Sequence, residues 1–175
     1  YRSKDKKIDG IRNRPIGTTG RGIGISYAVK AHREGIRIVD IFDESMLNDM
    51  EKEDKEFLYQ YRNRLQDMRI DITSFLSERR ADSILFEGAQ GILLDLDAGT
   101  YPYVSSGIST AAGAALGSGI GPRELDKIIG TFKAYSTRVG NGPFPSEFQK
   151  ERDGELEETI REIGREYGVT TGRAR

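Results

Sequence analysis

Residues 84–107, which read ILFEGAQGILLDLDAGTYPYVSSG, constrain the fold more than any other stretch of the chain. The stretch begins with a short apolar run at 84–86, typical of a buried strand, and then breaks at Glu87 and Gly88 into a glycine-punctuated polar loop. In open α/β sheets the ligand crevice lies beyond the carboxyl ends of the strands. Gln90 stands at this break, and its amide offers a donor and an acceptor that match a neutral base edge or a sugar.

Length and composition limit the kind of protein this can be. A chain of 175 residues suits one domain or a large part of one. The formal net charge of -1 argues against a nucleic-acid scaffold, so small ligands are the expected partners. Neither an apolar run of about 18 residues nor a signal peptide is present, which predicts a cytoplasmic protein without a membrane segment. The absence of cysteine excludes disulfides and thiolate metal sites.

A second glycine-rich segment, residues 16–24, carries two threonine hydroxyls and one arginine among four glycines. Backbone amides that face one way in such a segment form a nest for an anion, and the N-terminus of a following helix reinforces it, so a phosphate would fit. A flexible turn is the alternative interpretation. The helix predicted to follow, residues 26–34, carries Lys30 and Arg33 on one face and is expected to end at Gly35.

Hydrophobic patterns predict the other elements. Residues 36–42 are predicted to be a strand or a packed extended segment, and residues 128–139 a core strand that delivers Ser136, Thr137 and Arg138 to the ligand edge. The predicted helices cover residues 47–75, as one helix or two broken near Asp71, residues 109–121, and residues 156–167, with an end at Gly164 or Gly168. Residues 140–147 are predicted to form a rigid loop, and residues 1–15 an irregular or frayed segment.

Three motifs in the central stretch, FEGAQG at 86–91, LDLD at 94–97 and GTYPYV at 99–104, resemble the adenylosuccinate synthetase family. This family joins aspartate to IMP using GTP, and the likeness extends from Gly17 to Arg175. The resemblance implies an α/β fold of the P-loop NTPase kind, with a mainly parallel sheet and flanking helices. That fold would be incomplete here, so that residues 1–175 form one partial domain.

The chain contains no Gly-x-x-x-x-Gly-Lys-Ser/Thr motif and starts at Tyr1 without a methionine. We therefore expect it to be an internal portion of a longer enzyme. By resemblance, the phosphate loop and the ligands of a Mg²⁺ ion would lie before Tyr1, and the guanine-binding part after Arg175. No metal ligand is then expected within these residues, and the 175-residue piece alone is expected to be inactive.

The resemblance also implies roles for particular residues. It assigns Thr19, Gln90, Ser105 and Arg173 to IMP binding, with Ser105 standing where the family commonly has threonine. Arg33 would contact the IMP of a neighbouring subunit, which implies a homodimer, and Lys30 matches a signature lysine proposed to be catalytic. The implied aspartate-binding loop consists of Val169, Thr170, Thr171, Gly172, Arg173, Ala174 and Arg175. Arg175 would also sense GTP, and Ala174 departs from the arginine usual at its position.

Two other classes of function stay open on the residues alone. Asp95 and Asp97, with Glu87 nearby, could form a carboxylate metal site in a hydrolase or a sugar-nucleotide enzyme, because residues two apart on a strand point to the same side. The interpretation we favour is that both aspartates hold the glycine-rich loop through hydrogen bonds to its backbone. The third hypothesis is a non-catalytic nucleotide-binding module.

Overall fold

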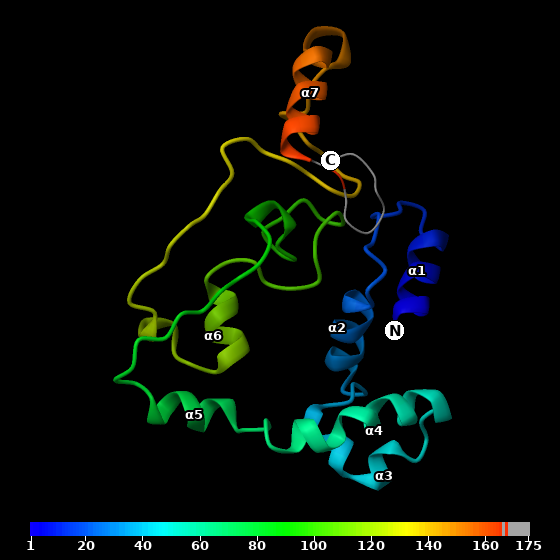
Figure 1. Ribbon diagram of the computed structural model, residues 1–175, viewed down its shortest axis with the longest axis vertical. Coiled ribbons are helices and arrows are strands. Elements are labelled where there is room, and N and C mark those ends of the chain that lie inside the picture. The colour runs from blue at the N-terminus through cyan, green and yellow to red at the C-terminus, as the bar shows by residue number, and fades with distance from the viewer. Residues whose placement is uncertain (166, 168–175) are drawn as a thin grey trace.

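The computed structural model of the protein describes residues 1–165 and 167 (Figure 1). Its helical elements, in chain order, are α1 (Arg2–Ile11), α2 (Ile23–His32), the 3-10 helix η1 (Ile38–Phe42), α3 (Glu44–Leu47), α4 (Lys52–Gln66), α5 (Ile72–Glu78), η2 (Ile92–Leu94), α6 (Ala112–Ser118), η3 (Pro122–Glu124) and α7 (Lys150–Gly164). In this part of the chain, no helix combines the length and the apolar character needed to cross a membrane.

Helix α1 lies in a segment that the sequence predicts to be irregular, and that prediction is wrong. α1 packs against α2 (Figure 1). Asp5 and Asp9 lie one helical turn apart on α1, and both accept hydrogen bonds from the glycine-rich segment that follows it. Tertiary bonds of this kind stabilise a short helix that has little apolar periodicity of its own.

Helix α2 confirms the helix predicted after the glycine-rich segment, but its end differs. The helix stops at His32, and Arg33 takes the left-handed C-cap conformation with φ 68°. The N–H of Arg33 donates to the carbonyl of Lys30 at 3.0 Å, which closes the last turn. The predicted end at Gly35 is therefore wrong, because a non-glycine residue performs the capping.

A small buried core lies near α3, and it contains residues 36–42, which the sequence predicts to be a strand or a packed extended segment. This segment forms the 3-10 helix η1 instead, because the Asp40 carboxylate accepts the N–H of Arg37 at 2.7 Å and curls the chain. Ile41 and Leu47 are 3% and 0% exposed, and the second side chain is fully buried. Arg62 of α4 binds Glu44 and donates to the carbonyl of Phe42 at 3.1 Å, so α4 is tied to this core.

The remaining helix predictions are confirmed with different boundaries: α6 is shorter than predicted, α5 extends past residue 75, and α7 begins before residue 156. The chain breaks before α5, and Asp71 forms its N-cap by accepting the Thr73 N–H at 3.1 Å. α6 occupies the small-residue run and ends at Gly119, whose φ is 79°. α7 begins with acidic side chains in its first turn and ends at Gly164. Capping residues, more than apolar periodicity, locate these ends.

The predicted strands at 84–86 and 128–139 are not paired into a sheet. In residues 1–165 no segment is a β-strand, and residues 84–89 and 125–133 have no regular structure. A strand requires hydrogen-bonded neighbours for its backbone N–H and C=O groups, and residues 1–165 contain no β-ladder that would supply them. Their apolar side chains stay exposed, with Leu85 at 86% and Phe132 at 93%. The described residues therefore do not confirm the predicted parallel sheet.

The whole arrangement is open, with helices spread around the periphery and α7 standing apart (Figure 1). Its accessible surface is 14311 Å². A compact monomer of 19.5 kDa would expose only about 8,500 Å². The excess area includes large apolar side chains such as Ile128 and Ile129, at 69% and 71% exposed. This surface is much larger and more apolar than a self-contained domain presents.

We expect urea unfolding of the isolated 175-residue chain to be broad, because the slope of the unfolding free energy scales with the area exposed. The m-value should fall below the range of about 1–3 kcal/mol/M typical of small proteins. Circular dichroism against urea concentration measures it. A sharp two-state transition, with an m-value normal for a compact domain of this length, would contradict the open arrangement.

Candidate functional site

Three irregular segments converge beside α2 and build the candidate site. They are residues 15–22 of the glycine-rich segment, which end where α2 begins, the loop at 93–109 and the turn at 138–142. The N–H of Asn141 donates to the carbonyl of Ile16 at 3.3 Å, and the Asn141 side chain donates to the carbonyl of Pro15 at 2.8 Å. Arg138 donates to the carbonyl of Tyr103 at 2.7 Å. The first and second segments are thus both bound to the third.

The contact between the first two segments uses glycine. A Cβ atom on Gly24 would stand 3.2 Å from the Ser106 hydroxyl oxygen, and one on Gly107 would stand 3.0 Å from the Tyr27 hydroxyl. Either side chain would force the neighbour to move. The absence of a Cβ at both positions therefore lets the N-terminal part of α2 approach residues 105–107.

The glycine-rich segment does not present the amide nest that its sequence predicts. The N–H groups of Ile16, Gly17 and Thr18 all donate to the carboxylate of Asp9, at 2.9, 3.1 and 2.9 Å. These amides are already occupied by an internal anion, so they are not available to a phosphate. Farther along, the Thr18 hydroxyl and the N–H of Gly22 also donate to a side chain, that of Asp5. The exposed Thr19 hydroxyl is therefore the group left for a ligand.

The pKa of Asp9 reflects this arrangement. Burial raises the pKa of the carboxyl, but the N–H groups of Thr18, Ile16 and Gly17, followed by the nearby Arg12, lower it below the usual value. Asp9 therefore holds its charge, and a charged acceptor makes the stronger hydrogen bonds. Sequence reasoning missed Asp5 and Asp9, although two acids four residues apart just before a glycine-rich segment are a readable signal.

The loop at 93–109 is organised around Asp95, which is only 2% exposed. One carboxylate oxygen accepts the N–H groups of Asp97 and Ala98, each at 3.0 Å, and the other accepts the N–H of Ser109 at 2.6 Å. Asp95 thus closes the loop across 14 residues. Its role in holding the loop confirms the favoured interpretation for this residue.

The metal-site hypothesis for Asp95 and Asp97 is not supported by this geometry, because both oxygens of Asp95 face backbone donors. Within residues 1–165 and 167, no group of three or more histidine, cysteine, aspartate or glutamate side chains could hold a metal ion. The same part of the chain shows no hydrogen bond to the Asp97 side chain, so only Asp95 holds the loop.

Arg138 joins the second and third segments. Its Nη2 atom donates to the Thr100 hydroxyl at 3.1 Å and to the carbonyls of Tyr103 and Asn141 at 2.7 and 3.3 Å. The sequence predicts that Arg138 reaches the ligand edge. Instead, its guanidinium holds two loops together, and the strand expected to deliver it is absent from the described residues.

The residues predicted to bind IMP lie on these segments or next to them. Thr19 and Gln90 are exposed, and Ser105 is half-buried. Gln90 has φ 64°, a left-handed conformation that is uncommon for a residue with a side chain. The Ser105 hydroxyl donates to the carbonyl of Leu94 at 2.9 Å, so in this conformation its proton is engaged and only its lone pairs are free.

The two basic residues predicted on α2 are exposed. Lys30 borders a small hollow of about 90 Å³ that it shares with Tyr1, Ser26 and Arg37. Arg33 caps the helix and points away from the core. The predicted aspartate-binding loop, which includes Arg173 and Arg175, lies outside the described residues.

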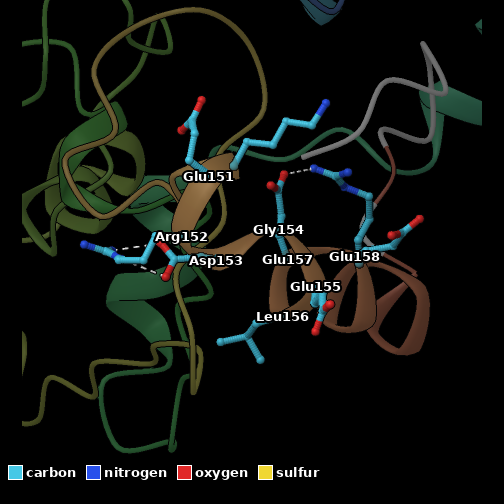
Figure 2. A pocket seen from close by; sticks show the side chains of 10 residues that line it. Glu151, Arg152, Asp153, Gly154, Glu155, Leu156, Glu157 and Glu158 are labelled. Atoms are coloured by element: carbon cyan, nitrogen blue, oxygen red, sulfur yellow. Dashed lines mark hydrogen bonds and ion pairs between the residues drawn. The ribbon is translucent and has the colours of Figure 1, made fainter.

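A larger hollow, about 860 Å³, lies elsewhere, along α7 from Lys150 to Arg161 (Figure 2). One helix alone lines it. Its charged side chains pair with each other, Arg152 with Asp153 at 2.8 Å and Arg161 with Glu157 (Figure 2). A hollow on one side of a single helix has no opposite wall, so it does not compete with the three segments as a binding site.

Protonation of Asp95 should loosen the loop at 93–109. The N–H groups of Ala98 and Ser109 lower the pKa of Asp95 below its usual value, against the opposing effect of burial. The stability that this carboxylate contributes is therefore complete above about pH 4 and is lost as the pH falls through the lowered pKa. Amide proton shifts of Ala98 and Ser109, followed by NMR from pH 7 to pH 2, should report that titration.

Asp95→Asn should abolish this titration, and Asp97→Asn is the matched control because it changes the same residue type two positions away. An unchanged acid titration of the Ala98 amide in Asp95→Asn would show that another group controls the loop.

Comparisons with known proteins agree with the motifs of the central stretch. The profile of the adenylosuccinate synthetase family matches residues 2–57 and 47–175. The adenylosuccinate synthetase of Petrotoga mobilis is 43% identical over 197 aligned positions, covering 100% of this chain and 46% of the relative. That of Aliivibrio fischeri is 44% identical over 189 positions, covering 93% of this chain and 43% of the relative.

A solved structure extends the likeness to the backbone. The fully ligated adenylosuccinate synthetase of Plasmodium falciparum superimposes with a TM-score of 0.83 at 34% identity, covering 99% of this chain and 46% of that one. The chain thus spans less than half the length of the relatives that it matches. On the sequence profile, the relatives and the backbone together, the chain belongs to the adenylosuccinate synthetase family.

Proposed function

We propose that this chain forms the IMP- and aspartate-binding portion of an adenylosuccinate synthetase. In the proposed reaction, GTP phosphorylates the 6-oxygen of IMP, and the amine of L-aspartate then displaces the phosphate to give adenylosuccinate. The observation that carries the proposal is the convergence of the three segments beside α2, which brings the Thr19 and Ser105 loops to one side of that helix. Family membership supplies the reaction class.

The proposed IMP contacts follow from the chemistry of the exposed groups. The Thr19 hydroxyl can donate to a phosphate oxygen, and the Gln90 amide can pair with a base edge or a ribose. The Ser105 proton is engaged by Leu94, so a phosphate contact requires the hydroxyl to turn away from that carbonyl. Ligand binding would then exchange one hydrogen bond for another at Ser105.

The left-handed backbone of Gln90 supports its proposed role. In the described residues, the non-glycine positions with positive φ are Arg33, Gln90 and Arg165. Arg33 and Gln90 are among the residues that the family resemblance assigns to IMP binding. Such a conformation costs about 1–2 kcal/mol and tends to persist at functional positions. Lys30 and the loop from Val169 to Arg175 enter the proposal by resemblance alone.

The metal ion of the proposed reaction does not fit residues 1–165 and 167. Among those that the structure describes, no cluster of ligands could hold Mg²⁺, and the Asp95 carboxylate is occupied by backbone amides. Magnesium and most of the GTP site are therefore proposed to come from the parts of the family enzyme that this chain does not span.

The predicted parallel sheet is also proposed to need the parts of the family enzyme that this chain does not span. We propose that the extended segments at 84–86 and 128–132 are strands of a P-loop-like parallel sheet in the complete enzyme. Their exposed apolar side chains, such as Leu85 and Phe132, are what buried strands of a parallel sheet carry. We also propose a cytoplasmic homodimer, consistent with the exposed position of Arg33 at the end of α2.

Gln90→Leu should weaken IMP binding in a complete enzyme made by joining residues 1–175 to the segments of the Petrotoga mobilis relative that they do not cover. Loss of a hydrogen bond to a buried partner costs about 1–3 kcal/mol, which raises the Michaelis constant for IMP roughly 5- to 150-fold. Steady-state kinetics with varied IMP measures it. Gln66→Leu, at the exposed end of α4, is the matched control.

Each outcome of this experiment is informative. Unchanged IMP affinity in Gln90→Leu would remove Gln90 from the site. Failure of the unsubstituted enzyme to form adenylosuccinate from IMP, aspartate and GTP would contradict the proposed function itself.

Arg33 should act across the subunit interface. Mixing Arg33→Leu subunits with Gln90→Leu subunits gives hybrid dimers in which one site has an intact Gln90 and receives an intact Arg33 from the other chain. Random mixing should restore about a quarter of the normal activity, because half the dimers are hybrid and each has one complete site of two. Absence of recovery in verified hybrids would show that Arg33 serves its own subunit.

A further inference from the structure

The glycine-rich segment at 16–22 contains three glycines with left-handed backbones, and side chains outside the segment fix its conformation. Gly17, Gly20 and Gly22 have φ values of 73°, 66° and 83°, all left-handed. Glycine adopts such conformations without strain but loses more freedom than any other residue when it is ordered. Outside the segment, its amides find their side-chain acceptors on α1.

Asp9 anchors the first half of the segment with both carboxylate oxygens. One oxygen accepts the N–H of Ile16, and the other accepts those of Gly17 and Thr18. Asp9 is 9% exposed, so these bonds are sheltered from water. An asparagine could not replace it, because only one of its two terminal atoms accepts and the other would point a donor at donors.

Asp5 anchors the second half. Its carboxylate accepts the hydroxyl of Thr18 at 3.1 Å and the N–H of Gly22 at 2.9 Å. The Thr18 hydroxyl oxygen in turn accepts the N–H of Gly20 at 3.2 Å. The two acids lie four residues apart on α1, so one face of the helix holds both halves of the segment.

Thr19 lies between the two anchored halves, and its side chain is exposed. In the described part of the chain, the N–H groups of Thr19 and Arg21 donate to no protein acceptor, unlike those of their anchored neighbours. Resting on the function proposed above, we propose that Asp9, together with Asp5, positions the Thr19 hydroxyl for the phosphate of bound IMP. Neither acid touches the ligand, so both act through Thr19.

The test is a double-mutant cycle in the complete enzyme defined above. Asp9→Asn should raise the Michaelis constant for IMP roughly tenfold, leave that for GTP within twofold, and change kcat little. In a Thr19→Ala background the same substitution should have almost no further effect, because the hydroxyl that Asp9 positions is gone. Asp71→Asn is the matched control, since Asp71 also accepts backbone N–H groups but caps α5 far from the site.

If the double variant shows the product of the two single effects on the Michaelis constant for IMP, the proposal is overturned. Equal changes in the Michaelis constants for IMP and GTP in Asp9→Asn would overturn it as well. If Asp9→Asn does not fold, the same double-mutant cycle is measured with Asp5→Asn in place of Asp9→Asn, and its result tests the positioning role. Failure of the proposed function is distinguishable, because it would appear as an absence of IMP-dependent turnover in the unsubstituted enzyme. Normal turnover with multiplying effects would reject only the positioning role.

Discussion

Carboxylates that accept backbone N–H groups hold the binding loops of this protein in place. The loops lack the repeating bonds of helices and sheets, and each buried N–H left without an acceptor would cost about 1–3 kcal/mol. Asp9 takes three such groups from the first segment and Asp95 takes three from the second. In both cases the backbone donors lower the pKa of the carboxyl, so the acceptor stays charged at neutral pH.

This arrangement changes how the glycine-rich segment is understood. A row of amides beside glycines is commonly taken as a cradle for an external anion, and the sequence supports that interpretation. Here the anion is a side chain of the same protein, supplied by α1. The amides at 16–18 therefore order the segment, and ligand recognition is the role we propose for Thr19, which the anchored neighbours leave exposed.

The sequence predicts part of this structure and misses part for identifiable reasons. Helices with clear caps, such as the one that begins after Asp71 and the one that ends at Gly119, follow from local rules. α1 does not, because its stability comes from bonds that Asp5 and Asp9 make to residues beyond the helix. The segment at 36–42, predicted as a strand or packed extended segment, curls into η1. The Asp40 carboxylate accepts the Arg37 N–H there, beside the backbone bonds of the 3-10 turn, and no apolar pattern reveals it.

Sequence motifs do identify two of the segments that meet beside α2, those that contain Thr19 and Ser105. The roles of the individual residues stay predictions. What no local pattern indicates is that Arg138 holds two loops together. Its bonds to Thr100 and Tyr103 join positions 38 and 35 residues apart in sequence.

The arrangement of the binding loops does not depend on a sheet. The extended segments at 84–86 and 128–132 are unpaired in the part of the chain described here, yet the loops that follow them still meet the glycine-rich segment. Three contacts are responsible, each between single residues of distant segments. They are Gly24 against Ser106, Gly107 against Tyr27, and Asn141 against Pro15 and Ile16. Since each contact needs a missing Cβ or one amide, the geometry between loops is encoded in a few small residues. A sheet completed by the rest of the family fold would then add stability and bury Leu85 and Phe132, while the relative positions of Thr19 and Ser105 follow from the loops themselves.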